Sequence, residues 1–201
     1  MINDKKVVAI IPARGGSKRL PKKNIYPIWG KPMIYWAIRS CQSSNYIDDF
    51  FVSTENSEIK DVSIGFGANV IDRPVSLSED WVYKQDAIVH AVQTLNQESG
   101  YKPDIVISLQ SNSPEINWVD IDNAIEKLVD FNRSEIFSVD ENLIQNAAFR
   151  IMVYDYVFQK TISTHCGVFK TNYVDVHDLD NVTYLEKYSH PAEDNDEKKN
   201  R

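Results

Sequence analysis

The chain has 201 residues and a formal net charge of −7 at pH 7. This length predicts one domain that can bury a core between two helical layers, and the acidic balance argues against a nucleic-acid-binding module, which needs a basic face. No stretch approaches the roughly 20 apolar residues of a membrane span, and the first residues lack the pattern of a secretory signal. The two cysteines, Cys41 and Cys166, are far apart and have no metal-type partners. We therefore expect a cytoplasmic protein that binds neither nucleic acid nor membrane.

The first predicted element is a strand over residues 7–11, followed by a basic loop. The strand is a nearly continuous β-branched run, which is typical of a parallel sheet buried on both faces, and Pro12 ends it. Five cations follow within ten residues: Arg14, Lys18, Arg19, Lys22 and Lys23. Gly15 and Gly16 allow a tight turn that brings N–H groups close to a ligand, and Ser17 adds a hydroxyl. Neither the P-loop spacing nor G-x-G-x-x-G is present, so the residues alone indicate either a polyphosphate site or a solvated basic turn.

The rest of the chain alternates between predicted helices and strands. The strands are expected over residues 50–53, 69–72, 104–109, 135–139 and 166–169. The helices, predicted from apolar residues at helical spacing, are expected over about 33–43, 58–66, 83–98, 118–131 and 180–188. This alternation predicts an α/β protein with a doubly wound, mostly parallel sheet in a three-layer αβα architecture. In such a sheet, ligands bind beyond the carboxyl ends of the strands.

Two segments have weaker patterns. Within 140–164, residues 148–154 and 156–158 are predicted to be short strands that form a hairpin or a dimerisation arm. Residues 189–201 lack large aliphatic side chains and are rich in charge, which is typical of a disordered tail. We therefore expect a single domain over residues 1–188.

Residues 11–24, Ile-Pro-Ala-Arg-Gly-Gly-Ser-Lys-Arg-Leu-Pro-Lys-Lys-Asn, resemble the N-terminal signature of the acylneuraminate (CMP-sialic acid type) cytidylyltransferases. That family belongs to the nucleotide-diphospho-sugar transferase superfamily, which has a Rossmann-like sheet. The resemblance implies that this loop binds the triphosphate and base of CTP. The nucleotide-binding residues that it implies are Arg14, Gly15, Gly16, Ser17, Lys18 and Asn24. The residues that it implies for catalysis are Arg14, Lys18 and Lys23.

A second segment also resembles the family. Arg73-Pro74, with Leu77 and Asp80 in register, resembles an Arg-Pro-x-x-Leu-x-x-Asp segment in which the Arg contacts the nucleotide. The alternative is a surface Arg in a turn. Related enzymes often carry small hydroxyl residues just downstream, whereas this chain has larger side chains at those positions. These residues are Val82, Tyr83 and Lys84.

A third segment, residues 109–114, reads Leu-Gln-Ser-Asn-Ser-Pro and resembles the family's Leu-Gln-Pro-Thr-Ser-Pro. The resemblance implies substrate contacts for Gln110 and Ser113. In sialic acid synthetases the next two residues are Leu-Arg, whereas here they are Glu115 and Ile116, so a cation is lost near the sugar-acid side of the site. The acceptor can therefore differ from that of the sialic acid synthetases.

Asp175 and His177 resemble the family's Asp-x-Asp or Asp-x-His pair, which binds magnesium. One carboxylate together with CTP phosphates is chemically sufficient for Mg²⁺. The alternative is an ordinary strand-to-helix junction with Asp178 as the helix cap. In the related Kdo synthetases an Asp for metal stands where this chain has Asn112. His165, just before the last predicted strand, is expected to face the sugar and bind substrate.

The resemblance implies a cytidylyltransferase that activates a keto sugar acid with CTP and Mg²⁺, gives the CMP-sugar and pyrophosphate, and works as a homodimer. Two alternatives stay open. One is a cytidylyltransferase for a different acceptor, and the other is a nucleotide-binding homologue that has lost its chemistry. A nucleic-acid module is a more distant alternative, because the basic residues are confined to one loop.

Overall fold

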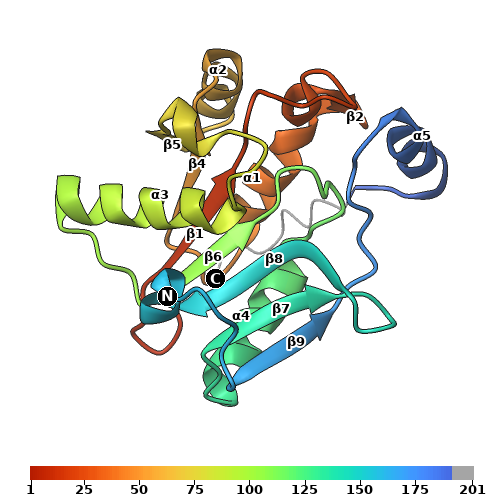
Figure 1. Ribbon diagram of the computed structural model, residues 1–201. Coiled ribbons are helices and arrows are strands. Elements are labelled where there is room, and N and C mark those ends of the chain that lie inside the picture. The colour runs from red at the N-terminus through yellow and green to blue at the C-terminus, as the bar shows by residue number, and fades with distance from the viewer. Residues whose placement is uncertain (192–201) are drawn as a thin grey trace.

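The structure, a computed structural model, describes residues 1–191 (Figure 1). Its centre is a seven-stranded sheet in the order β5-β4-β1-β6-β8-β7-β9. The strands are β1 Val7–Pro12, β4 Asp49–Thr54, β5 Asn69–Asp72, β6 Ile105–Leu109, β7 Glu135–Val139, β8 Gln145–Val153 and β9 Cys166–Lys170, with a separate hairpin of β2 Pro27–Ile28 and β3 Lys31–Pro32. The helices are α1 Met33–Ser43, α2 Ser57–Gly65, α3 Lys84–Ser99, α4 Trp118–Asp130 and α5 Leu179–Tyr188. Short 3-10 helices are η1 Lys23–Ile25, η2 Val75–Leu77 and η3 Tyr154–Phe158.

Strand β1 lies in the interior of the sheet, between β4 and β6, and runs parallel to both. Successive side chains of a strand point to opposite faces, and β1 feeds two cores in this way. Val7, Ala9 and Ile11 pack in the cluster that α1 and α4 cover, while Val8 and Ile10 pack in the cluster that α3 covers. All five are fully buried. The predicted three-layer αβα architecture is therefore confirmed, with helices on both faces of the sheet (Figure 1).

The second half of the sheet departs from the sequence prediction at β8. This strand pairs antiparallel with both β6 and β7, so the predicted strand over 148–154 lies inside the sheet and does not form a hairpin with 156–158. The strand predicted over 156–158 is wrong, because these residues form η3. The 3-10 turn buries Val157 in the α3 cluster, and Gln85 of α3 donates a hydrogen bond to its carbonyl oxygen at 2.7 Å. A three-residue apolar run contains too little periodicity to separate these two outcomes.

Helix α5 lies beside the β2–β3 hairpin and the basic loop (Figure 1). Its buried residues Val182 and Leu185 pack with Leu20, Ile28 and other residues in a third apolar cluster. Asp178 accepts a hydrogen bond from the Asn181 N–H at 3.1 Å and begins the helix in a capping box. The cap proposed for Asp178 is thus confirmed.

The predicted disordered tail lies almost entirely outside the described residues, which end at 191. Within the described part of the chain, no helix is both long and apolar enough to cross a membrane.

Candidate active site

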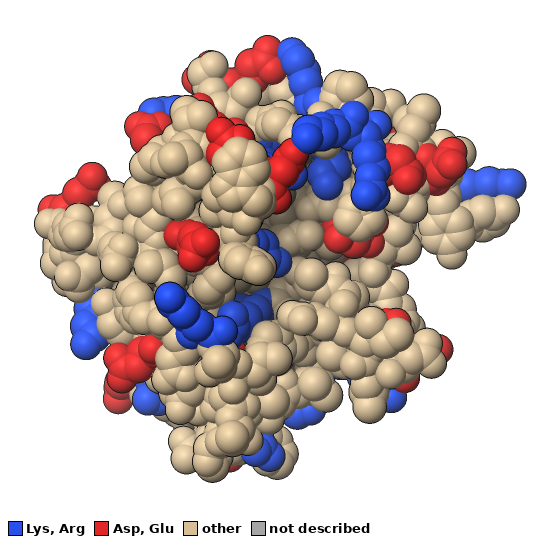
Figure 2. All heavy atoms as spheres, in the orientation of Figure 1, with Lys and Arg blue, Asp and Glu red and all other residues tan. Residues whose placement is uncertain are grey.

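A cavity of about 480 Å³ opens at the carboxyl edge of the sheet, where the loops after β1, β5 and β6 converge. Figure 2 shows it as a hollow near the centre of the molecule, with Lys and Arg side chains at its rim and inside. Its lining includes Arg14, Ser17, Lys18, Arg19, Lys23, Asn24, Arg73, Asp80, Lys84, Gln110, Ser111, Asn112 and His177. The structure therefore brings most of the predicted site residues to one place.

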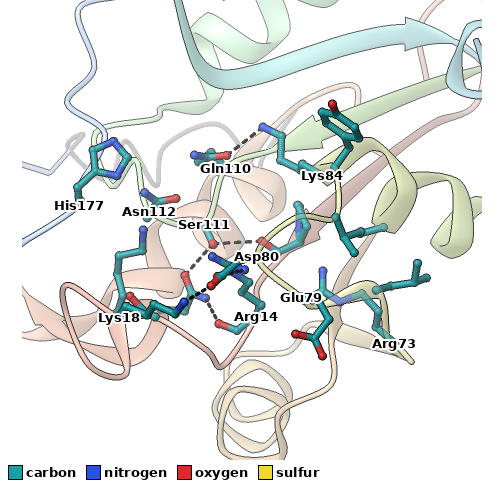
Figure 3. Close-up of a pocket in the computed structure, with 18 of the residues that line it drawn as sticks. Arg14, Lys18, Arg73, Glu79, Asp80, Lys84, Gln110, Ser111, Asn112 and His177 are labelled. Carbon is teal, nitrogen blue, oxygen red and sulfur yellow. Dashed lines mark hydrogen bonds and ion pairs between the residues drawn. The ribbon is translucent and has the colours of Figure 1, made fainter. Parts of the chain in front are cut away.

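The cations of the basic loop meet Asp80 across the mouth of this cavity (Figure 3). Arg14 forms an ion pair with Asp80 at 2.8 Å, and Lys18 contacts the other carboxylate oxygen of the same residue. Lys18 and then Arg14 hold the pKa of Asp80 below its ordinary value. The pairing shows that a negatively charged group is accommodated between these two cations.

Polar bridges beneath the loop fix its path. Asn24 donates a hydrogen bond to the carbonyl oxygen of Arg14 at 2.8 Å, and the Ser111 hydroxyl donates to Asn24 Oδ1 at 2.8 Å. Ser111 follows β6, so the turn after one strand is tied to the loop after its neighbour. Asn24 and Ser111 both line the cavity, and Ser111 was not singled out from the sequence.

Glu55 is a site residue that the sequence interpretation missed. It directly follows β4, and its carboxylate accepts three hydrogen bonds: from Gly15 N–H at 2.7 Å, from Arg73 Nη2 at 2.8 Å and from the Ser78 hydroxyl at 2.6 Å. Burial alone would raise the pKa of Glu55, but these hydrogen bonds outweigh it and the pKa lies below its ordinary value. The rule that ligands gather beyond strand ends could have identified Glu55. The next residue, Asn56, caps α2.

The contacts of Gly15 give a packing reason for glycine at that position, whereas those of Gly16 do not. The Gly15 N–H does not face the cavity, because it is donated to Glu55. A Cβ at Gly15 would lie 2.6 Å from the Asn56 side chain, so glycine is required for close packing there. At Gly16 a Cβ would meet nothing within 4 Å.

Arg73 is buried, with only 6% of its surface exposed, and it lines the cavity. The alternative of a surface Arg in a turn is therefore wrong. Its Nη2 atom forms an ion pair with the Glu55 carboxylate. Its Nε atom has no hydrogen-bond partner among the described residues. A buried donor that lacks a protein partner is available to a ligand that enters the cavity.

Asp175 contacts three side chains that line the cavity. Gln110 donates to its carboxylate at 3.3 Å, Asn112 forms a shorter hydrogen bond to it, and His177 Nε2 lies 3.3 Å from Oδ2. Burial lowers the pKa of Lys23, and Arg14 lowers it further, while the charge of Asp175 opposes the shift. The carboxylate and the basic loop thus act on each other electrostatically.

The side chains around Asp175 offer Mg²⁺ one carboxylate, which is the smallest number of protein carboxylates that such a site uses. Among the described residues, no group of three or more His, Cys, Asp or Glu side chains could hold a metal ion. Mg²⁺ accepts one or two carboxylates when substrate phosphates and waters supply the other ligands. A single carboxylate at the edge of a cation-lined cavity meets that lower requirement, and His177 is a poor Mg²⁺ ligand that contacts this carboxylate.

Lys84, the first residue of α3, reaches into the cavity opposite the basic loop (Figure 3). Its Nζ donates hydrogen bonds to Gln110 Oε1 at 2.9 Å and to the carbonyl oxygen of Ala147 at 3.4 Å. The side chain keeps accessible surface because it faces the open cavity, yet enough protein surrounds it that burial lowers the pKa of Lys84 to about 8. The charge of Asp175 opposes this shift and that of Arg150 adds to it.

Two predicted substrate-binding residues lie away from the cavity. Ser113 is 1% exposed, and its hydroxyl has no partner among the described residues. His165 directly precedes β9, which runs parallel to β7, and its carbonyl oxygen accepts the Ser134 N–H at the amino end of β7. It is therefore exposed at the edge of the sheet opposite the cavity.

Comparison with known proteins shows which family the chain belongs to. A family model described as cytidylyltransferase matches residues 8–197. The chain belongs to the cytidylyltransferase family. It is 33% identical over 137 residues to a pseudaminic acid cytidylyltransferase of Campylobacter jejuni, which covers 68% of this chain and 59% of that protein. It is 36% identical over 124 residues to a CMP-N,N'-diacetyllegionaminic acid synthase of Legionella pneumophila, with coverages of 60% and 52%.

Among solved structures, a CMP:2-keto-3-deoxy-manno-octonic acid synthetase complexed with CTP has the same fold as this cytidylyltransferase family member. Its TM-score is 0.74 at 17% identity, over 90% of this chain and 97% of that one. By sequence, the chain spans between about half and three fifths of the two curated relatives named above.

Proposed function

We propose that the chain transfers CMP from CTP to the anomeric hydroxyl of a keto sugar acid. The acceptor oxygen forms a bond to the α-phosphorus of CTP, and the bond from that phosphorus to the bridging oxygen breaks. Pyrophosphate leaves with the electron pair, and the hydroxyl proton passes to solvent. The observation that carries this proposal is that Arg14, Lys18 and Lys23 line one cavity in a chain that belongs to the cytidylyltransferase family. Asp175 contacts Gln110, Asn112 and His177, which line the same cavity.

The cations supply what this reaction needs from a protein. Phosphoryl and nucleotidyl transfer depend mainly on positioning the reactants and on neutralising charge that develops on phosphate oxygens. Arg14 and Lys18 already hold one carboxylate, Asp80, between them. A triphosphate would replace that carboxylate with a more highly charged anion. Lys23, deeper in the cavity, would contact the α- and β-phosphates.

Mg²⁺ is proposed as the cofactor, held by Asp175 together with phosphate oxygens and water. When bound, it would neutralise part of the triphosphate charge. Gln110 and Asn112 orient the Asp175 carboxylate, and His177 contacts the same carboxylate. A homodimer and a cytoplasmic location remain predictions.

The acceptor class follows from the relatives, whose names include pseudaminic, legionaminic and N-acylneuraminic acids and an 8-amino octulosonate. These acceptors share a carboxylate beside the anomeric carbon. The segment that carries an Arg in sialic acid synthetases has Ile116 here, which is 1% exposed and packed in the core. Glu115 is used by the fold, because its carboxylate accepts the Val174 N–H and the Ser189 hydroxyl. An acceptor other than N-acetylneuraminate is therefore a specific second candidate.

The test is pyrophosphate release from CTP and Mg²⁺ with a panel of keto sugar acids: pseudaminic, legionaminic and N-acetylneuraminic acids, Kdo and its 8-amino analogue. We expect release with at least one acid and none when the acceptor is omitted. Identification of the CMP-sugar by mass spectrometry gives the acceptor. If CTP binds but no acid supports release, the proposed activity is wrong and the chain is a nucleotide-binding homologue.

His165→Ala should change turnover with the best acceptor by less than about two-fold. The side chain is exposed at the sheet edge opposite the cavity, and exposed substitutions away from the site usually have small effects. Steady-state pyrophosphate release measures this. A loss of ten-fold or more would mean that His165 contacts the acceptor after all.

A further inference from the structure

The cavity has a second positively charged end, which Lys84 forms. Figure 3 shows Lys84 on the opposite side from Lys18, reaching from the start of α3 toward Gln110. The cations of the basic loop belong to the segment after β1, whereas Lys84 is the first residue of α3. The two ends are therefore built independently.

Among residues 1–191, no ion pair neutralises the charge of Lys84. Both hydrogen-bond partners of its Nζ, Gln110 Oε1 and the carbonyl oxygen of Ala147, are neutral. The neighbouring Arg150 differs in this respect, because its guanidinium donates to the fully buried carboxylate of Glu135 at 2.9 Å through Nε. Lys84 keeps accessible surface, but protein surrounds its ammonium group and lowers its pKa. An anion that binds beside it would supply the counter-charge that its neutral partners lack.

Lys84 also lies one side chain away from the proposed reaction centre. Gln110 accepts a hydrogen bond from Lys84 through Oε1, and it donates through Nε2 to Asp175 at 3.3 Å. In the cyclic form of a 2-keto sugar acid, the anomeric carbon carries both the hydroxyl and the carboxylate. A cation beside the metal-binding carboxylate can therefore hold the acceptor carboxylate while the adjacent hydroxyl faces the α-phosphate.

We propose that Lys84 binds the carboxylate of the acceptor and so selects a 2-keto sugar acid over a neutral sugar. This inference rests on the proposed cytidylyltransferase function. Its support is the geometry of this chain: a cation whose described hydrogen-bond partners are neutral lines the cavity, and Gln110 links it to Asp175. Lys84 is thus a specificity residue in a segment where related enzymes carry small hydroxyl side chains.

The test compares Lys84→Gln with wild type, using the acid that the panel identifies and the same sugar with its carboxylate converted to a carboxamide. We expect Lys84→Gln to raise the acceptor KM about 10- to 100-fold, the size expected for a lost charged hydrogen bond. The Kd for CTP should change by less than about two-fold. Wild type should bind the carboxamide more weakly than the acid by a similar factor. The Lys84→Gln variant should bind the acid and the carboxamide equally. Lys102→Gln, an exposed lysine over the Tyr154 ring, is the matched control.

The pH dependence of kcat/KM distinguishes binding of the acceptor by Lys84 from a purely structural role of this residue. Lys84 is charged below its pKa of about 8, so the kcat/KM for the acid should fall as the pH rises through that value, and Lys84→Gln should lack this step. The charged groups that act on Lys84 are Asp175, which raises its pKa, and Arg150, which lowers it. Lys84→Arg, which keeps the charge, should recover part of the acceptor affinity.

Failure of this inference can be told from failure of the proposed function. If wild type releases pyrophosphate with an acid and Lys84→Gln has the same acceptor KM, the role of Lys84 is wrong and the function stands. A higher KM for CTP with unchanged acceptor KM would make Lys84 a phosphate ligand and overturn the inference. If no acid supports release, calorimetry with the CMP-loaded chain decides, because equal binding of acid and carboxamide to wild type contradicts the inference.

Discussion

Replacing Lys23 by alanine should reduce pyrophosphate release by about 10²–10³-fold or more while the chain stays folded, because a group that stabilises developing charge typically contributes that much. Lys23 begins η1 and lines the cavity. Burial and the nearby Arg14 and Arg19 lower its pKa, so its ammonium group sits where extra positive charge is unfavourable until an anion arrives. Removing it therefore removes a contact that is strongest when phosphate charge is present.

Lys22→Ala is the matched control for this variant. Lys22 is adjacent in sequence, but its exposed side chain forms an ion pair with Glu58 and does not line the cavity. We expect its turnover to remain within about two-fold of wild type. Circular dichroism and thermal melting check that both variants fold. Wild-type turnover in folded Lys23→Ala would contradict the assignment of the basic loop to the triphosphate.

The elements with strong local patterns could be predicted from the sequence. The run at residues 7–11 became β1 Val7–Pro12, and the apolar stripe of the helix predicted over 83–98 became α3 Lys84–Ser99. The order of the strands could not be predicted, because β8 inserts between β6 and β7 through pairings with residues distant in the chain. The strand predicted over residues 156–158 was wrong for a related reason, because packing against α3 decides the structure of this segment.

The site shows the same division between local and distant information. The basic loop could be identified because its five cations lie within ten residues of the sequence. The partners that organise it come from elsewhere: Gly15 is 40 residues from Glu55, and Gln110 is 65 residues from Asp175. His165 was expected to face the sugar from the resemblance to the family, but residues at the cavity follow a parallel strand, whereas His165 precedes β9. In a parallel sheet that difference places a residue at the opposite edge.

Glu55→Ala should lower the free energy of unfolding by about 3 kcal/mol, because it leaves the buried Arg73 without its counter-charge. The exposed fractions of the two side chains in this pair are 4% for Arg73 and 13% for Glu55, so solvent screens their interaction little. The change also releases the Gly15 N–H and the Ser78 hydroxyl. Since these two residues belong to the two loops that enclose the triphosphate end of the cavity, the KM for CTP should rise in the same variant.

Urea unfolding at constant m value measures the first effect, and Glu58→Ala is its control. Glu58 is three residues away, and its ion pair with Lys22 has side chains 53% and 66% exposed, so its loss should cost less than about 1 kcal/mol. The pKa of Glu55 is lowered in the folded chain, so its contribution is complete above the unfolded pKa of about 4.3 and is lost as the pH falls through the folded value. The difference between wild type and Glu55→Ala should therefore be full at about pH 7 and shrink in acid. Equal stability of Glu55→Ala and Glu58→Ala at neutral pH would show that Glu55 does not hold the two loops together.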